Sequence, residues 1–161
     1  MVELKKQLIE YLVENSRYTT KQLAMMLGAS EEVVAAAIKE LEDEKVIVKY
    51  TAVVNSDKQD SSEVTALIQV SVKPQKLKGF DALAEELCAF PEVQNLYLIS
   101  GGFDLAVIVK AKDLGAVARF VSEKLSGIDG VISVSSHFIL KKYIIEGQPT
   151  TPSSSERQIL L

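Results

Sequence analysis

The segment from Val93 to Lys110 constrains the fold of this chain more than any other stretch. Two short apolar runs, rich in Val, Ile, Leu and Tyr, flank the sequence SGGFD at positions 100–104. Runs of this length and composition favour strands over helices. Paired glycines supply the positive φ angles that a tight turn between strands requires, and aspartate tolerates turn geometry. The pattern therefore predicts a β-hairpin with Asp104 at the end of its turn.

A helical pattern and a further strand pattern lie on each side of this hairpin. Residues 64–72 alternate between apolar and polar side chains, which predicts a half-buried strand. Apolar residues at helical spacing predict helices over residues 80–90 and 114–125, and a last strand pattern covers residues 131–145. The order β-α-β-β-α-β predicts an α+β, ferredoxin-like domain, in which two helices cover one face of an antiparallel sheet.

A separate helical unit precedes this domain. Apolar spacing predicts a first helix over about residues 2–15. Thr19 and Gln22 form a capping-box pattern at the start of a second helix, and Ser30 is placed to cap a third. Two helices joined by a short glycine-containing turn predict a helix-turn-helix. The strand-like residues 46–54 predict either a short wing or a connecting strand.

Polar and turn-forming residues divide the chain. The sequence NSDKQDSS at positions 55–62 predicts a linker between a winged helix-turn-helix domain at residues 1–54 and the ferredoxin-like domain at residues 63–146. Residues 147–161 contain two prolines and a serine run, and we expect them to form a mostly disordered tail.

Composition sets limits on function. A net charge of -4 gives no overall electrostatic bias towards nucleic acid, and 47% apolar residues are typical of a soluble globular protein. The single cysteine, Cys88, excludes an intramolecular disulfide, fits a reducing compartment and is expected to be a small buried apolar group. No metal or cofactor site is readable. The chain lacks a signal-peptide pattern and a membrane-length apolar run, which predicts a cytoplasmic protein.

Four segments carry a family resemblance when they are taken with the order of elements. They are residues 19–27 (TTKQLAMML), residues 30–50 with the ending LEDEKVIVKY, residues 51–55 (TAVVN) and the hairpin sequence SGGFD. Together they span most of residues 1–146, and in this order they resemble the Lrp/AsnC, or feast/famine, family of transcriptional regulators.

The resemblance implies a homo-oligomer that binds double-stranded DNA. The N-terminal unit of such proteins binds DNA, the C-terminal sheet helps to form a dimer, and dimers assemble into higher even-numbered oligomers. A small effector, often an amino acid, is bound between dimers. Carried over by position, the effector site would include Ser100, Gly101, Gly102 and Asp104, with Leu98, His137 and Phe138 nearby.

The chemistry of the hairpin agrees with this implication but permits another interpretation. Backbone amides exposed by two glycines can receive an effector carboxylate, and Asp104 can pair with its ammonium group. Alternatively, the glycines only close the hairpin and Asp104 caps it.

The expected recognition helix is acidic. Related proteins usually carry arginine in its middle, where this chain has three alanines, and residues 1–55 contain nine acidic residues against seven basic ones. Lysine and arginine normally supply the phosphate contacts that give most of the affinity for DNA. The residues expected to contact DNA are Arg17, Lys21, Ser30, Ala35, Ala36, Lys39 and Lys49.

Two other functions fit the same two-domain plan. The first is an effector-sensing oligomeric module with weak or lost DNA binding, in which the acidic helices dock a protein. The second is an enzyme, because siroheme decarboxylases resemble this architecture. That chemistry requires several Arg or His groups, whereas the chain has one histidine, His137, and three arginines. We therefore expect no catalytic residues and no enzymatic activity.

Overall fold

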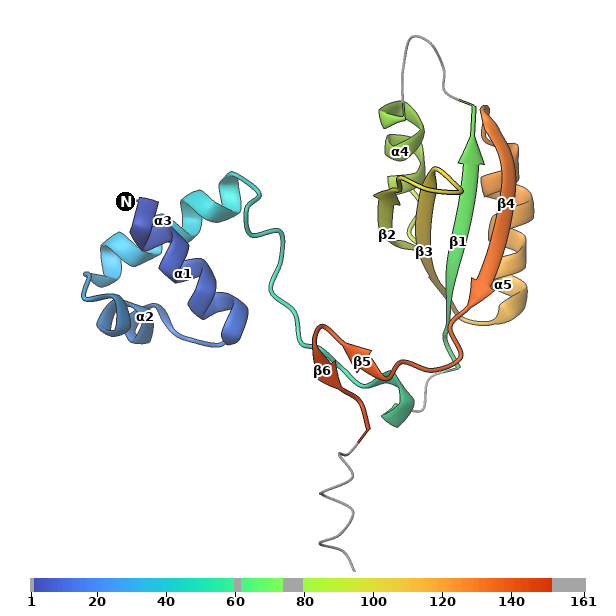
Figure 1. Ribbon diagram of the computed structural model, residues 1–161. Helices are drawn as coiled ribbons and strands as arrows, with labels where there is room; N and C mark the ends of the chain where they lie inside the picture. Colours follow the sequence, from blue (N-terminus) through green and yellow to red (C-terminus); the bar gives the residue numbers. More distant parts are fainter. Residues whose placement is uncertain (1, 60–61, 74–79, 152–161) are drawn as a thin grey trace, which may run out of the picture. The chain divides into compact units, whose positions relative to one another are not determined.

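A computed structural model of the protein describes residues 2–59, 62–73 and 80–151 (Figure 1). Contacts within the chain separate two compact units, with the division between Val54 and Asn55. Each unit is described by itself below.

The first unit consists of three helices, α1 (Val2–Glu14), α2 (Thr20–Leu27) and α3 (Glu31–Asp43). Each helix turns one apolar stripe inward, as the helical spacing predicts. The buried side chains form one core, made of Leu8, Leu12, Leu23, Ala24, Val34, Ala37 and Leu41. The helix-turn-helix prediction is confirmed.

Side-chain caps set the starts of α2 and α3, and a glycine ends α2 between them. The Thr19 hydroxyl accepts a hydrogen bond from the backbone amide of Gln22 at 3.3 Å. The backbone amide of Thr19 donates in return to the side-chain oxygen of Gln22 at 2.9 Å. The helix ends at Gly28, whose φ of 62° is the left-handed conformation in which glycine is unstrained. The Ser30 hydroxyl then accepts from the Val33 amide at 3.4 Å and starts α3.

The strand expected over residues 46–54 is not present. Ile47 is joined to α3 by its backbone amide, which donates to the Leu41 carbonyl at 2.9 Å, and a short 3₁₀ turn follows at Ser56–Lys58. A strand requires a neighbouring strand to satisfy its backbone groups, and no described segment of this chain pairs with residues 46–54.

The second unit contains a four-stranded antiparallel sheet in the order β2-β3-β1-β4. Helices α4 (Asp81–Cys88) and α5 (Leu114–Arg119) cover one face of it (Figure 1). This order and the alternation of strands and helices are those of a ferredoxin-like fold, so the prediction is confirmed. The strands are β1 (Val64–Val72), β2 (Val93–Leu98), β3 (Leu105–Ala111) and β4 (Val131–Phe138).

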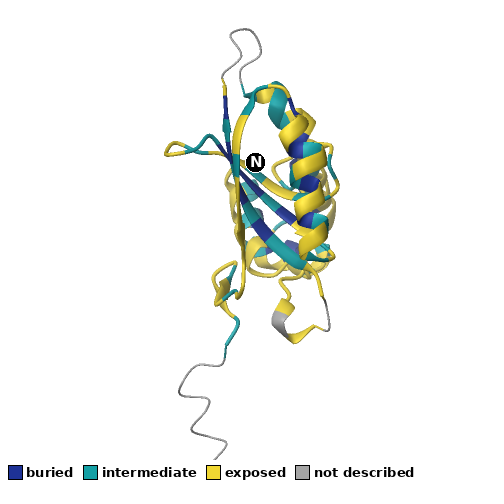
Figure 2. Ribbon diagram, turned by 90° about the vertical axis from the view of Figure 1, so that its right-hand side faces the viewer, coloured by how far each residue is buried: buried dark blue, intermediate teal, exposed yellow. Residues whose placement is uncertain are grey.

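The alternation along β1 separates a buried face from an open one. Ala66, Ile68 and Val70 are fully buried beneath the helices, and Figure 2 shows the buried residues concentrated between the sheet and its helices. The intervening residues of β1 are only half-buried and lie on the opposite face, because successive side chains of a strand point to opposite sides. They are Thr65, Leu67, Gln69 and Ser71.

The second covering helix is irregular. After α5 the chain forms a π-helical segment, Phe120–Lys124, and then a 3₁₀ turn, Leu125–Gly127. Lys124 forms an ion pair with Glu92 at 2.5 Å and lies over the Phe90 ring. The hydrogen bond from Lys124 lowers the pKa of the Glu92 carboxyl below its usual value. The irregular helix is therefore fixed to the start of β2.

The C-terminal part differs from the expectation in two ways. The last long strand ends at Phe138, and a small hairpin follows, formed by β5 (Ile144–Ile145) and β6 (Gln148–Pro149). The tail expected from residue 147 is not disordered at its start, since residues 148 and 149 are paired; residues 152–161 lie outside the described residues.

Thr150 fastens this hairpin. Its amide donates to the Tyr143 carbonyl at 2.9 Å and its hydroxyl donates to the Lys142 carbonyl. The carbonyl of Thr150 in turn accepts from the Asn55 side chain at 2.8 Å. The small hairpin is thereby joined to the first residue of the second unit.

The exposure of Cys88 also differs from the expectation. This residue is exposed instead of buried. The apolar stripe of α4 passes through Leu87, which is fully buried. The next residue along a helix points about 100° away, and this places the thiol outside the core.

Candidate nucleic-acid interface and effector site

The hairpin loop reverses the chain without left-handed glycines. Six residues, 99–104, join β2 to β3, and the Ile99 amide donates to the Asp104 carbonyl at 2.8 Å. Neither Gly101 nor Gly102 has a positive φ, so the expectation of a tight turn built on positive φ angles is wrong. A six-residue loop has enough length to reverse direction in ordinary backbone conformations, whereas two-residue turns do not.

Asp104 ties this loop to the end of β1. Its amide donates to the Val70 carbonyl at 3.1 Å, and its Oδ2 accepts from the Val72 amide at 2.8 Å. Strand β3 begins only at Leu105, so the carboxylate extends the ladder that β1 forms with β3 by one more bond. The geometry thus supports a capping role for Asp104, which was the alternative interpretation of its sequence pattern.

The strand order places Leu98 and His137 at opposite edges of the sheet. Leu98 pairs with Leu105 and thereby lies in one row with Val70 and Val134. His137 is three strands away from Leu98 and three residues further along β4 from Val134. These separations correspond to about 14 Å across the strands and about 10 Å along them.

His137 and Phe138 also lie on different faces. His137 pairs with Leu67 on the open face, where its Nε2 is 3.2 Å from the Ser135 hydroxyl. Phe138 pairs with Ala66, whose side chain is on the helix-covered face. A single chain therefore brings Ser100, Gly101, Gly102 and Asp104 together but does not bring His137 and Phe138 to them.

Helix α3 has one buried side and one exposed side. Val34, Ala37 and Leu41 form its buried stripe, and Ala35, Ala36 and Lys39 are exposed on the other side. The Ser30 hydroxyl already serves as the helix cap.

The other expected DNA contacts lie outside α3, and all are exposed. Arg17 lies in the connection before α2, where its amide donates to the Asn15 side chain at 3.1 Å. Lys21 is the second residue of α2, and Lys49 follows α3 in the segment without a strand. Their positions at the helix-turn-helix surface are compatible with contacts to phosphates.

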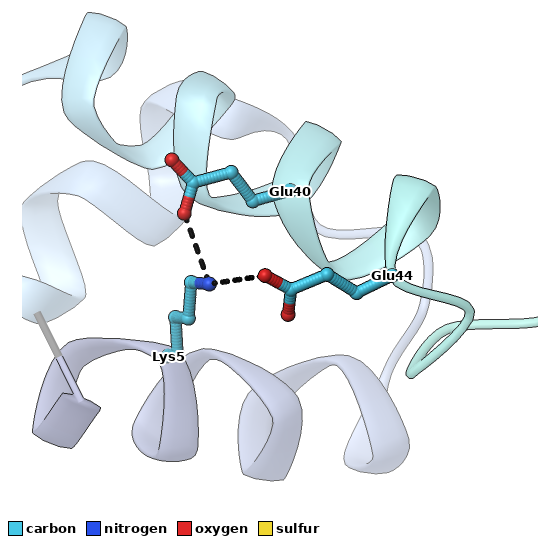
Figure 3. Close-up of polar contacts among 3 residues, drawn as sticks. All are labelled: Lys5, Glu40 and Glu44. Atoms are coloured by element: carbon cyan, nitrogen blue, oxygen red, sulfur yellow. Dashed lines mark hydrogen bonds and ion pairs between the residues drawn. The ribbon is translucent and has the colours of Figure 1, made fainter.

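The sequence analysis did not predict the ion pairs and hydrogen bonds of the acidic side chains in and next to α3. Six acidic residues occur between positions 31 and 44, and five of them have partners within the first unit. Lys5 forms ion pairs with Glu40 at 2.9 Å and Glu44 at 3.5 Å (Figure 3). Lys39 pairs with Asp43 at 2.8 Å. The Tyr50 hydroxyl donates to Glu42 at 3.0 Å.

These contacts shift several pKa values. A hydrogen bond with Glu40 raises the pKa of Lys5, and one with Asp43 raises the pKa of Lys39. Partial burial and the bond to Glu42 raise the pKa of Tyr50. Hydrogen bonds from the backbone amide of Glu32 and from the Ser30 hydroxyl lower the pKa of the Glu32 carboxyl. The Lys39–Asp43 pair is readable from sequence as an i,i+4 spacing, whereas the partners of Glu40, Glu42 and Glu44 depend on the fold.

The described part of the chain shows neither a metal cluster nor a membrane helix. Over residues 2–59, 62–73 and 80–151, no three His, Cys, Asp or Glu side chains are grouped to hold a metal ion. No helix in the same ranges combines the length and apolarity needed to cross a membrane.

Comparison with known proteins assigns both units. Residues 1–48 match the family model for a winged helix-turn-helix DNA-binding domain, and residues 65–149 match the model for the Lrp/AsnC ligand binding domain. The chain is thus a helix-turn-helix transcriptional regulator with a ligand-binding domain. It belongs to the Lrp/AsnC family, which is a family of regulators and not of enzymes.

Individual relatives align over nearly their whole length. The uncharacterized HTH-type transcriptional regulator YugG of Bacillus subtilis is 41% identical over 162 residues, which cover 100% of this chain and 98% of that protein. The regulator LrpA of Pyrococcus horikoshii is 36% identical, covering 87% and 96%. A transcriptional regulator from Neisseria meningitidis, solved as a complex with L-Met, superimposes with a TM-score of 0.66 at 25% identity, covering 95% and 97%.

Proposed function

We propose that this protein regulates transcription by binding specific double-stranded DNA and that a small effector, an amino acid, changes this binding from a site between dimers. The observation that carries the proposal is the presence of both family domains in one chain that aligns end to end with a regulator. An amino-acid effector is supported by the Neisseria meningitidis relative, which was solved with L-Met.

The open face of the sheet supports assembly into dimers. It combines half-buried apolar residues, Leu67 and Ile108, with small polar ones, Ser71 and Thr65. A face of mixed character without helices over it suits a self-complementary contact between two copies.

The proposed effector site uses the loop at residues 99–104 from one dimer and further residues from another. His137 and Phe138 lie far from the loop of their own chain, and a neighbouring dimer would have to supply them if they take part. Asp104 would shape the loop, and the backbone amides of residues 100–102 would receive the effector carboxylate. An effector that binds one assembly better than another shifts the population and with it the spacing of the DNA-binding units.

Fluorescence anisotropy tests this proposal. The probe is a labelled duplex from the region upstream of the protein's own gene, titrated at low and moderate salt with and without the twenty amino acids in pools. We expect binding that is stronger than to a scrambled duplex, that weakens steeply with salt, and that shifts with at least one pool. Binding equal to that of the scrambled duplex in every condition would contradict the proposal.

A second candidate function is a docking module that has lost DNA binding. The observation that favours it is the composition of α3, where five acidic residues stand against Lys39 as the only basic one. In this case the oligomeric state, measured by sedimentation, would still change with an amino acid. Anisotropy would show no preference for the upstream duplex.

A further inference from the structure

Lys5 joins α1 to α3 at the edge of their shared core. It lies one turn before Leu8, a fully buried residue of α1. Of its two partners, Glu40 is next to the buried Leu41 on α3, and Glu44 is the C-cap of that helix. The Lys5 side chain is 22% exposed, whereas that of Glu40 is 49% exposed. Figure 3 shows its ammonium group between the two carboxylates.

The position of this contact matters because α3 has different faces. Its buried stripe contacts α1 and α2, and the exposed Ala35, Ala36 and Lys39 lie on the opposite side. Glu40 and Glu44 are four residues apart and form one row along the flank between these two faces. A contact on a flank adds to the buried stripe of α3 a second restraint against rotation of the helix about its own axis.

We infer that Lys5 is a positioning residue for DNA binding: it holds Glu40 and Glu44 on the flank of α3 and so sets which face of that helix meets the duplex. The inference rests on the proposed DNA-binding function. Lys5 does not have to touch DNA in this role, because it acts through the two carboxylates.

Loss of Lys5 has two consequences for the interface. It leaves Glu40 and Glu44 as two uncompensated negative charges next to the presented face, and it removes one restraint on the orientation of α3. Both effects oppose the approach of phosphates, since like charges repel and a misplaced helix loses its contacts. Lys6 provides a matched control: it is the next residue of α1, carries the same charge, is exposed and takes no part in this contact.

The experiment compares Lys5→Gln with Lys6→Gln in the full-length protein. Each variant removes one positive charge, so the net charge of the two is equal. Anisotropy with the upstream duplex at low salt should show that Lys5→Gln weakens binding about fivefold more than Lys6→Gln does, which corresponds to ~1 kcal/mol. Lys5→Arg keeps the ion pairs and should bind within about twofold of the unmodified protein.

A charge exchange separates positioning from stability. Lys5→Glu combined with Glu40→Lys restores one of the two ion pairs and should recover most of the affinity that Lys5→Glu alone loses. All measurements are made at a temperature where circular dichroism shows each variant fully folded. Under these conditions a residue with only a structural role would lower the melting temperature and leave the affinity unchanged.

Three results have distinct meanings. Equal loss of affinity in Lys5→Gln and Lys6→Gln would overturn the inference and leave DNA binding standing. A lower melting temperature with unchanged affinity would also overturn it. If the unmodified protein does not distinguish the upstream duplex from a scrambled one, the proposed function fails, and the inference fails with it.

Discussion

The two candidate sites hold their carboxylates in different ways. On α3, Asp43 contacts the end of a long, exposed side chain, that of Lys39, which is 73% exposed in this pair. In the hairpin loop, Asp104 accepts from the backbone amide of Val72 in a part-buried contact. The first arrangement adjusts the charge of a surface and contributes little to stability. The second completes a strand ladder, and removing it leaves a backbone donor without its acceptor.

Asp104 should therefore show the largest effect on stability. We expect Asp104→Ala to lower the free energy of unfolding by about 2 kcal/mol, because the Val72 amide loses its partner. Asp104→Asn keeps an oxygen acceptor and should lose less than half of that. Urea unfolding followed by circular dichroism measures both. If Asp104→Ala is as stable as the unmodified protein but no longer responds to amino acids, the carboxylate is an effector ligand and the capping interpretation is wrong.

Ser30 tests whether one residue serves both fold and interface. Ser30→Ala removes the cap of α3 and should reduce stability by about 1 kcal/mol. Ser30→Asp keeps the cap but adds a negative charge at the surface expected to meet DNA. It should be as stable as the unmodified protein and bind DNA more weakly. Thermal unfolding and anisotropy together measure the two effects, and unchanged DNA binding by Ser30→Asp would remove Ser30 from the interface.

The Glu92–Lys124 pair adds a pH dependence to the second unit. The folded-state pKa of Glu92 is lowered, so the pair stabilises the protein above the unfolded-state pKa of glutamate. That contribution, about 1 kcal/mol or less, is lost as pH falls through the lower, folded-state pKa. Unfolding between neutral and acidic pH should therefore depend less on pH in Glu92→Gln than in the unmodified protein. Parallel curves for the two would contradict this.

Lys39 should show the smallest effect. Its pair with Asp43 has i,i+4 spacing on an exposed helix face, and such pairs contribute roughly 0.3–0.5 kcal/mol. Lys39→Gln should change the stability by no more than that, while it weakens DNA binding if Lys39 contacts a phosphate. A stability change above about 1 kcal/mol in thermal unfolding would show that exposed ion pairs on α3 stabilise the protein more than the comparison with Asp104 implies.

The sequence predicted what depends on local patterns. The caps at Thr19 and Ser30, the alternation of β1 and the order of helices and strands follow from neighbouring residues, and the structure has them. Other features depend on contacts across the fold. The partner of Asp104 is 32 residues away, and those of Lys5 are 35 and 39 residues away. Residues 46–54 show a different kind of error: their composition favours a strand, but no strand of the described residues pairs with them.

The connection between the two units is held at both of its ends. Tyr50 is bonded to Glu42 of α3, and Asn55 is bonded to Thr150 beside the small C-terminal hairpin. Only Thr51–Val54 lie between these anchors, and the five steps from Tyr50 to Asn55 can span at most about 18 Å when fully extended. The tether is thus short compared with one turn of duplex DNA, about 34 Å. In the dimer that we propose, a connection this short would limit how far each helix-turn-helix can move from the sheet of its own chain. The assembly, and not the reach of a long linker, would then select the spacing of the half-sites.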